Sequence, residues 1–356
     1  MEYEIELLGK QDTFISQCRE TILEAAIRSG VSLEYGCSIG TCGLCKAKLV
    51  SGEVEEIRTH EYVIPEAEKL QNYILTCVCA AKQNLVIDAP VASSVADIPK
   101  QSVGVKVRKI DALSSTVVRL LVQTPRTNRL RFLAGQYMQL EIAGIGSGYF
   151  SIASCPCEDR RIEFHVRISE NDPVSFHIAN VMRPGDPLEL HGPFGNFVFD
   201  ESAGRSILLF AFDAGFAAIK SLLEHITAQE QDYSIDLIWL SCGSDGLYMN
   251  NLCRSWGDAL DQFSYQGIAL HQAFDQLKEQ SQMGSIIVEK ALERVMRNFE
   301  DLSCHDVYVC APLPAIVLFE RICTARKLPA SRFFTEPVRG NEDIACMTVP
   351  AETNRE

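Results

Sequence analysis

The chain opens with short stretches in which polar and apolar side chains alternate, the pattern of a strand with one buried face. Strand-like stretches of this length cover residues 2–8, 13–18, 46–50 and 85–88. Between them, Thr21 and Glu24 have the spacing of a capping box at the start of an Ala-rich helix that ends at Gly30. This order of strands, helix and loop predicts a small α+β domain over residues 1–92.

The next segment, residues 91–102, has small and polar side chains without periodicity, which predicts a linker. Short strand-like stretches separated by turn residues follow. The clearest of them are residues 117–122, 137–142 and 162–168. Short, closely spaced strands favour an antiparallel barrel or sandwich, and we place this second domain at residues 103–200.

Beyond Gly204, apolar strands alternate with stretches of helical periodicity. We expect strands at residues 207–211, 235–240, 307–310 and 332–335, and helices from Phe216, over 247–260, over 285–299 and after Pro314. Alternation of strand and helix is typical of a parallel sheet covered by helices. The third domain is therefore predicted to be parallel α/β over residues 204–337, followed by a loose polar tail at 338–356.

Composition and charge narrow the class of protein. Apolar residues make up 47% and charged residues 22% of the chain, as in soluble globular proteins. No apolar run reaches the length of a membrane span and the first residues lack a signal-peptide pattern, so we expect a cytoplasmic protein. A net charge of −14 argues against nucleic acid as a partner. The acidic surplus of residues 1–92 is either a solvated surface or a docking face for a basic protein.

Four of the fourteen cysteines have the spacing of a plant-type [2Fe-2S] ligand set, in which four thiolates hold two irons. They are Cys37, Cys42, Cys45 and Cys77. Gly36, Gly40 and Gly43 allow the backbone to wrap around a cluster and to aim amide groups at its sulfurs. The alternatives are a zinc site, which usually pairs two Cys-x2-Cys elements, or buried free thiols. Cys79 competes with Cys77 for the fourth position.

Two further cysteines, Cys155 and Cys157, flank a proline. Without a neighbouring basic residue or helix N-terminus, we expect them to be unreactive loop thiols. A disulfide framework belongs to short secreted chains and is not expected in a chain of this length.

The second domain carries four motifs in a fixed order. They are Gly135-Gln-Tyr137, Tyr149-Phe-Ser151-Ile-Ala-Ser154, Pro184-Gly185-Asp186 and His191-Gly192-Pro193-Phe194-Gly195-Asn-Phe197. With the cysteine loop, they give residues 1–337 a resemblance to the three-domain ferredoxin/FAD/NAD(P) reductase family. This family belongs to the ferredoxin-NADP reductase superfamily and includes oxygenase-reductase components and the CDP-6-deoxyglucoseen reductases.

The resemblance implies a β-grasp-like [2Fe-2S] ferredoxin, an antiparallel FAD-binding β-barrel and a parallel α/β nucleotide-binding domain. It implies that Phe150 and Ser151 lie against the flavin ring, with the Ser151 hydroxyl near the flavin N5 atom. The cofactor-binding residues that it assigns are Tyr149, Phe150, Ser151, Gly192, Gly195 and Gly215. Its catalytic assignments are Ser151, Cys310, which in the family faces the nicotinamide, and Glu336, an acid near the flavin.

The chain departs from the family at the arginine that holds the flavin pyrophosphate. The family motif is Arg-x-Tyr/Phe-Ser, and the arginine position is Gly148 here. The change removes a bidentate charged contact to phosphate, so we expect FAD to bind more weakly. Gly144, Gly146 and Gly148 either present backbone amides to an anion or form a flexible turn.

The nucleotide loop also departs from the family. The family's Gly-Gly-Thr-Gly corresponds to Phe212-Asp213-Ala214-Gly215, and its Gly-x-Arg corresponds to Leu240-Ser241-Cys242. Phosphates bind at helix N-termini through backbone amides and the helix dipole, and we expect bulky Phe212 and negative Asp213 to oppose that approach. Nicotinamide use is therefore predicted to be weak and NADPH to be disfavoured, unless Asp213 accepts a ribose hydroxyl.

The three domains together predict an electron path. Nicotinamides deliver two electrons as hydride and a [2Fe-2S] cluster passes one at a time, so a flavin has to stand between them. We expect an enzyme that passes electrons from NAD(P)H, with NADH preferred, through FAD to the cluster and on to a partner oxygenase or dehydrase. The alternative is a non-enzymatic ferredoxin-type electron-transfer or docking subunit whose nicotinamide site has decayed.

Overall fold

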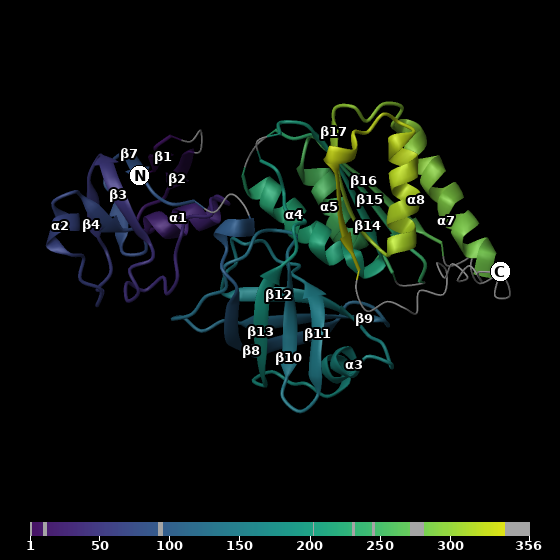
Figure 1. The fold of residues 1–356 in the computed structure, drawn as a ribbon, viewed down its shortest axis with the longest axis horizontal. Helices are drawn as coiled ribbons and strands as arrows, with labels where there is room; N and C mark the ends of the chain where they lie inside the picture. Colours follow the sequence, from purple (N-terminus) through teal and green to yellow (C-terminus); the bar gives the residue numbers. More distant parts are fainter. Residues whose placement is uncertain are drawn as a thin grey trace, which may run out of the picture.

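A computed structural model describes residues 2–9, 13–91, 95–201, 203–229, 232–243, 246–270 and 281–338, without the side chains of 281–285. The elements form three bodies, drawn in Figure 1 as a purple and blue N-terminal part, a teal barrel and a green and yellow C-terminal part. No helix within the described ranges is both long and apolar enough to cross a membrane. The predicted tail lies outside the described residues, apart from Val338.

The N-terminal part is a mixed sheet with a helix packed against it. Its elements are β1 (Tyr3–Leu7), β2 (Thr13–Ser16), α1 (Ile22–Arg28), β3 (Lys46–Ser51), β4 (Val54–Glu56), α2 (Glu66–Lys69), β5 (Tyr73–Leu75), β6 (Cys79–Ala81) and β7 (Leu85–Asp88). The five-stranded sheet has the order β2-β1-β7-β3-β5, and β1 and β7 are parallel. Helix α1 begins as predicted, because the Thr21 hydroxyl accepts from the Glu24 amide and the Glu24 carboxylate accepts from the Thr21 amide.

The second part is an antiparallel barrel. Its elements are η1 (Val95–Asp97), β8 (Gln101–Ala112), β9 (Val117–Gln123), β10 (Tyr137–Ile142), β11 (Gly146–Ser151), β12 (Arg161–Arg167), α3 (Pro173–Asn180) and β13 (Pro187–Phe194). The strand order is β11-β10-β13-β8-β9-β12. A bridge between Ile152 and Phe164 joins the two outer strands, which closes the sheet. A barrel is therefore formed and not a sandwich.

The third part is a parallel sheet with helices on both faces. Its elements are β14 (Ser206–Phe212), η2 (Asp213–Gly215), α4 (Phe216–Ala228), β15 (Ile235–Ser241), α5 (Asn250–Ala259), β16 (Phe263–Ala269), α7 (Ser281–Val295), η3 (Met296–Asn298), β17 (His305–Ala311), α8 (Leu313–Thr324), η4 (Ala330–Arg332) and β18 (Phe333–Pro337). The strand order is β16-β15-β14-β17-β18, with every pair parallel. Helices α7 and α8 pack on one face, and α4 and α5 on the other.

The predicted fold class is confirmed, while the domain limits themselves stay predictions. Several strands differ from expectation: β4, β5, β6, β11 and β13 were not predicted individually, and β8 and β16 also differ. Strand β8 begins at Gln101, inside the predicted linker. The sequence did not show this start because alternate side chains of the strand are polar and face outward. Strand β16 was not predicted, since an edge strand keeps polar residues that hide its pattern.

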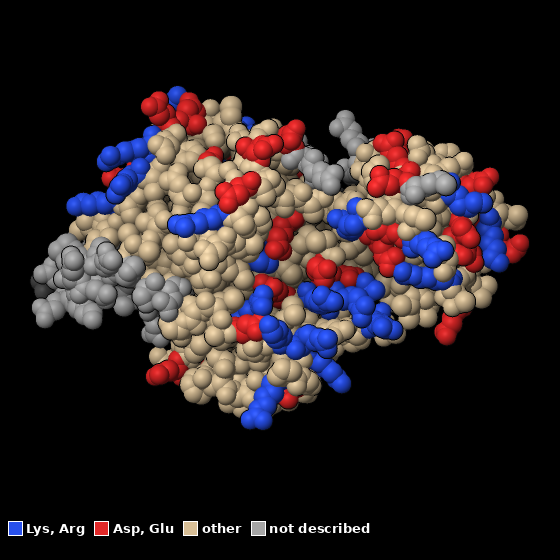
Figure 2. Space-filling view, turned by 180° about the vertical axis from the view of Figure 1, so that it is seen from behind, with Lys and Arg blue, Asp and Glu red and all other residues tan. Residues whose placement is uncertain are grey.

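Charged side chains of both signs cover all three parts. On the face that Figure 2 draws, acidic and basic side chains are interspersed over the N-terminal part, and Lys and Arg side chains gather on the barrel beside it. The acidic surplus of residues 1–92 is therefore not gathered into one patch on this face.

Candidate functional site

The four predicted ligand cysteines lie together at one end of the N-terminal sheet. Cys37, Cys45 and Cys77 are buried, whereas Cys42 is exposed. The Sγ atom of Cys45 lies 3.2 Å from Sγ of Cys77, and the Cys37 amide donates to Sγ of Cys42 at 3.3 Å. Cys79 is also buried, on β6 opposite Glu56. The close approach of Cys45 and Cys77 supports Cys77 as the fourth ligand, which stays a prediction.

Hydrogen bonds in the loop favour the thiolate form of Cys37. Its Sγ atom accepts from the backbone amides of Thr41 at 3.2 Å and Cys42 at 3.4 Å. Burial by itself raises the pKa of Cys37, but hydrogen bonds from Thr41 and from the Ile39 amide outweigh it and lower the pKa to about 6. Iron is bound by thiolates, so at Cys37 the loop favours the protonation state that a cluster needs.

Two glycines make the loop possible. Gly40 and Gly43 have φ angles of +77° and +74°, in the left-handed region that glycine enters without steric cost. A Cβ atom at Gly40 would collide with the Cβ of His60, and one at Gly43 would collide with the ring of Tyr62. The loop is therefore closed in by residues 60–62. This cradle and its sulfur-directed amides fit a [2Fe-2S] cluster.

A buried polar contact ties the cysteine loop to the barrel. Tyr35, two residues before Cys37, donates its hydroxyl to Oδ2 of Asp159 at 3.0 Å. The Arg129 guanidinium donates to both oxygens of the same carboxylate, at 2.7 and 2.9 Å. Burial, and then the charge of Asp159, raise the pKa of Tyr35, which keeps this hydroxyl protonated and able to donate. The loop therefore has a fixed attachment to the barrel.

Cys155 and Cys157 lie next to this attachment, in the turn that follows the end of β11. They form a disulfide, so the expectation of free thiols is wrong for this pair. Spacing alone did not show that the turn brings the two sulfur atoms together. Cys157 lines a narrow gap that Leu33 and Tyr35 line from the N-terminal part.

A cleft of about 240 Å³ lies between the barrel and the N-terminus of α4. Its lining residues are Gly148, Tyr149, Phe150, Ser151, His165, Arg167, Asp172, Ala214, Gly215, Ala217 and Val338. The walls are joined by two buried hydrogen bonds, from Lys220 Nζ to the Ala153 carbonyl at 3.0 Å and from Ser221 Oγ to the Ser154 carbonyl at 2.7 Å. The structure thus brings together four of the predicted flavin and nucleotide residues, Tyr149, Phe150, Ser151 and Gly215.

Gly192 and Gly195 flank Pro193 and Phe194, and the centroid of the Phe194 ring lies 5.9 Å from that of the Tyr149 ring. The Tyr137 ring stacks on Phe194 with centroids 5.6 Å apart and meets Tyr149 edge-on at 5.9 Å. A Cβ at Gly195 would lie 3.0 Å from the Tyr137 ring and 3.2 Å from Oε2 of Glu336. Glu336 is buried beside this aromatic group. Its predicted place near a flavin in the barrel is therefore supported and stays a prediction.

Cys310 is not among the described residues that line the cleft. It lies on β17, fully buried, with Gly215 packed against its carbonyl group. Burial, followed by the charge of Glu336, raises the pKa of the Cys310 thiol, so this thiol stays protonated and unreactive. A role for Cys310 at the nicotinamide stays a prediction.

Phe212 does not stand in the path of a nucleotide, contrary to expectation. Its side chain is fully buried in the apolar cluster under α7 and α8, with Phe210 and Leu240. Alternate residues of a strand face opposite sides of the sheet. Phe212 therefore faces away from α4, whose N-terminus borders the cleft.

Asp213 also differs from expectation, because its carboxylate is turned inward. The residue is 2% exposed. Its Oδ1 atom accepts from the Ser241 hydroxyl at 2.6 Å and from the Cys242 amide at 3.3 Å, and its Oδ2 atom accepts from Arg167 at 3.1 Å. The charge is therefore paired and does not project toward an incoming phosphate.

Three polar cleft residues were missed by sequence reasoning: His165, Arg167 and Asp172. His165 is buried and lies 2.8 Å from Glu163 and 3.0 Å from the hydroxyl of Tyr248, two residues that are both partly exposed. Burial lowers the pKa of His165, in spite of the Glu163 carboxylate beside it. Alternation along β12 marks Arg167 as an outward-facing position of the strand. This pattern does not identify Asp213 as its partner.

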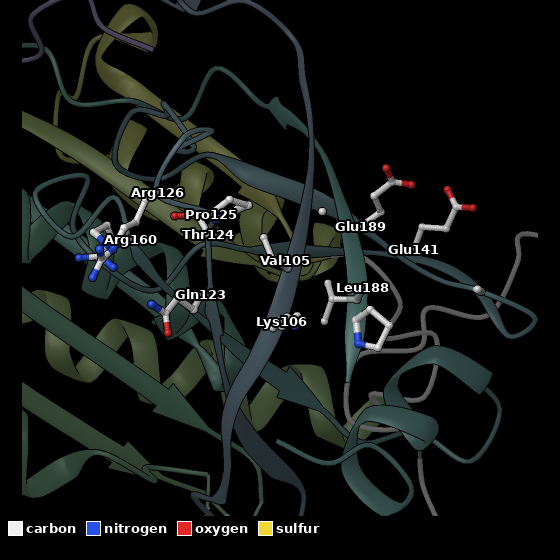
Figure 3. A pocket seen from close by; sticks show the side chains of 13 residues that line it. Val105, Lys106, Gln123, Thr124, Pro125, Arg126, Glu141, Arg160, Leu188 and Glu189 are labelled. Carbon is white, nitrogen blue, oxygen red and sulfur yellow. The ribbon is translucent and has the colours of Figure 1, made fainter. Parts of the chain in front are cut away.

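A larger hollow of about 720 Å³ lies on the outer face of the barrel, away from these residues. Figure 3 shows Arg126 and Arg160 at one end of it and Glu141 and Glu189 at the other. Its lining comes from β8, β9, β10 and β13 and includes none of the predicted flavin residues. Although this hollow is larger than the cleft, we do not assign it as the cofactor site.

The acidic end of that hollow has an ion-pair cluster. His191 Nε2 lies 3.1 Å from the Glu141 carboxylate and 3.9 Å from that of Glu189, while His191 Nδ1 lies 2.7 Å from the Ser102 hydroxyl. Both glutamates are exposed, so water screens these pairs. The cluster is a surface feature of the barrel.

Comparison with known proteins identifies two of the three domains. Residues 5–82 match the 2Fe-2S iron-sulfur cluster binding domain, and residues 104–199 match the oxidoreductase FAD-binding domain. The chain carries these two domains in the order of the three-domain ferredoxin/FAD/NAD(P) reductase family, which it resembles. Several relatives and some solved structures match almost end to end.

Protein RfbI of Salmonella typhimurium is 29% identical over 340 residues, 96% of both chains. CDP-6-deoxy-L-threo-D-glycero-4-hexulose-3-dehydrase reductase of Yersinia pestis is 28% identical, over 91% of this chain and 94% of the relative. The toluate 1,2-dioxygenase electron transfer component of Pseudomonas putida is 27% identical, over 89% and 92%. The Amycolatopsis cytochrome P450 reductase GcoB shares the fold, with a TM-score of 0.58, 20% identity and coverage of 94% and 98%.

The barrel of this reductase fits the ring of a flavin better than its pyrophosphate. Tyr149, Phe150 and Ser151 supply aromatic surface and a hydroxyl in one wall of the cleft. Of the described residues that line the cleft, Arg167 is the only Lys or Arg, and it is paired with Asp213. Asp172 adds a carboxylate, which caps α3 by accepting from the amides of Val174 and Ser175.

Gly148→Arg is expected to tighten FAD binding by this reductase by one to two decades, since a charge-assisted hydrogen bond contributes about 1.5 to 3 kcal/mol. The φ angle of Gly148 is not left-handed, but a Cβ there would lie 2.9 Å from the Phe150 ring, which has to shift. Gly148→Ala is the matched control, because it adds the Cβ without the charge. The dissociation constant of FAD is measured by fluorescence titration of the flavin-free chain. An arginine variant that binds no tighter than the alanine variant would contradict the expected phosphate contact.

Proposed function

We propose that this chain is a reductase that takes up electrons at an FAD in the barrel and delivers them singly, through a [2Fe-2S] cluster, to an oxygenase or dehydrase component. One observation carries the proposal: an FAD-binding domain and a cysteine loop with the ligand spacing occur in one chain and are joined by the Tyr35–Asp159 hydrogen bond. The similar proteins named as dehydrase reductase and dioxygenase electron transfer component support the choice of partner.

The cysteine loop and the cleft have different roles in the proposed reaction. When bound, the flavin exchanges electron pairs for single electrons, and the cluster carries single electrons. Cys37, Cys42, Cys45 and Cys77 would hold the irons as thiolates. Tyr149 and Phe150 would shield the ring of a bound flavin from water, and the Ser151 hydroxyl would donate a hydrogen bond to it.

The outer edge of the cysteine loop is the proposed exit for electrons. Cys42 is exposed and Leu44 beside it is 51% exposed, while Cys37, Cys45 and Cys77 face the interior. An exposed apolar side chain next to a ligand lets a partner approach the cluster closely and exclude water. The loop thus has one face toward the barrel, through Tyr35, and one toward solvent.

NADH is the proposed electron donor, and its reaction is expected to be slow. Arg167, the cation in the cleft, is paired with Asp213. At the family's Gly-x-Arg motif, this chain has Ser241 and Cys242 in place of the last two residues. In anaerobic stopped-flow absorbance, flavin bleaching should need roughly millimolar NADH and should be slower still with NADPH, whose additional phosphate meets no unpaired Lys or Arg among the described residues that line the cleft. Fast bleaching at micromolar NADPH would contradict this expectation.

A second candidate function is favoured by the same Asp213 contacts. It is a ferredoxin-type electron-transfer or docking subunit that takes electrons from another protein. The visible spectrum of the purified chain, recorded before and after NADH is added, separates the two. A flavin spectrum that bleaches supports the reductase, and a cluster spectrum with no response to NADH supports the subunit. A cytoplasmic location is proposed for both.

A further inference from the structure

The inference concerns Asp213, which begins the turn η2 before α4. Its φ angle is +47°, in a region that residues other than glycine rarely enter and that costs about 1 to 3 kcal/mol. The conformation is held by the Trp239 indole, which donates to the Asp213 carbonyl at 3.0 Å. The strained backbone turns the carboxylate into the protein instead of out of the loop. Such strain persists only where the surroundings enforce it.

The inward carboxylate accepts hydrogen bonds from three donors. Ser241, the Cys242 amide and Arg167 supply three hydrogen bonds. Gly246 covers the remaining side so tightly that a Cβ there would overlap the Ser241 hydroxyl. These are the groups that an anion-binding site requires: a guanidinium, a hydroxyl and a backbone amide. The carboxylate of Asp213 itself occupies this anion-binding site.

Arg167 connects this occupied site to the cleft. Its side chain is 29% exposed and lines the cleft together with Ser151 and Gly215. A dinucleotide in the cleft brings a negatively charged pyrophosphate, and Arg167 is the only Lys or Arg among the described lining residues. If the pyrophosphate takes Arg167, Asp213 is left buried without its cation, which is costly. The binding free energy gained from the contact between Arg167 and the pyrophosphate is then largely offset by the loss of the contact between Arg167 and Asp213.

We propose that the Asp213 carboxylate competes with the pyrophosphate of a dinucleotide for Arg167. This competition sets the affinity of the cleft for the dinucleotide. The inference rests on the proposed function, since it takes a dinucleotide to be the ligand. FAD and NAD(P)H share the pyrophosphate, and the experiment distinguishes them. Binding is measured instead of electron transfer, and inorganic pyrophosphate is included as a probe without flavin or nicotinamide.

The test compares Asp213→Asn with the native chain. Asparagine keeps the size and the acceptor for Ser241 but removes the charge that holds Arg167. We expect the dissociation constants of NADH, NADPH and pyrophosphate to fall about ten- to a hundredfold, the range of one charge-assisted hydrogen bond. Calorimetric titration of the cluster-loaded chain measures them, and FAD is titrated into the flavin-free chain. A gain confined to FAD, or one confined to the nicotinamides, also supports the competition and assigns Arg167 to that ligand.

Asp306→Asn is the matched control. Asp306 pairs with Arg205 at 2.9 Å, with side-chain exposures of 2% and 29%, close to the 3% and 29% of the Asp213 pair. This control should leave every ligand affinity unchanged, and Arg167→Gln added to Asp213→Asn should cancel the gain. Unchanged affinities in Asp213→Asn would overturn the proposal. Weaker NADH binding with unchanged pyrophosphate binding would also overturn it, by making Asp213 an acceptor for a ribose hydroxyl.

Discussion

Replacing Cys77 by serine is expected to remove the EPR signal of the reduced cluster and to lower the iron bound per chain. The substitution takes one thiolate from a set of four, and serine is a poor substitute for sulfur on iron. Cys77 is fully buried and its Sγ atom lies 3.2 Å from that of Cys45, so no outside ligand has room to replace it. The measurement is EPR after dithionite reduction, together with an iron assay.

Cys79→Ser is the matched control for this prediction. Cys79 is buried like Cys77 and only two residues away, but it lies on strand β6. Its serine variant should keep the iron and the signal. Loss of the cluster in the Cys79 variant, with retention in the Cys77 variant, would reverse the ligand assignment.

Phe212→Ala is expected to destabilise the α/β part by about 3 to 5 kcal/mol, the usual cost of emptying a buried phenylalanine site. Phe212 is fully buried and packs with Phe210 and Leu240 beneath α7 and α8. The sequence had suggested that the bulk of Phe212 opposes the approach of a nucleotide phosphate. The structure predicts a cavity in the core instead. Scanning calorimetry of the full chain measures the shift of the transition.

An exposed phenylalanine provides the comparison. Phe176 on α3 is 43% exposed, and Phe176→Ala should change stability by no more than about 0.5 kcal/mol. If Phe212→Ala were as mild as Phe176→Ala while tightening nucleotide binding, Phe212 would have to face the cleft, contrary to the burial described above.

Most strands and helices followed from the sequence, because their patterns repeat within a few residues. Strand β10 (Tyr137–Ile142) and strand β7 (Leu85–Asp88) have the predicted limits. Strand β16 was missed because an edge strand pairs on one side only and tolerates polar residues along it.

The candidate site was predicted less completely, because its chemistry depends on contacts between distant segments. The spacing of the cysteines identified the loop, but no local pattern indicates the contact between Tyr35 and Asp159, which are 124 positions apart. The direction of Phe212 was available from alternation, since it has the same parity as Phe210 along β14. The pairing of Asp213 with Arg167 joins two domains and has no local signal.

Electron transfer from flavin to cluster within one chain is tested most directly by anaerobic reduction of the FAD- and cluster-loaded protein with excess NADH. Flavin absorbance is followed while samples are frozen for EPR. The signal of the reduced cluster should rise as the flavin bleaches, and the Cys77→Ser chain should bleach without that signal. A native chain whose flavin is fully bleached while its cluster stays oxidised, although dithionite reduces that cluster at once, would contradict the account.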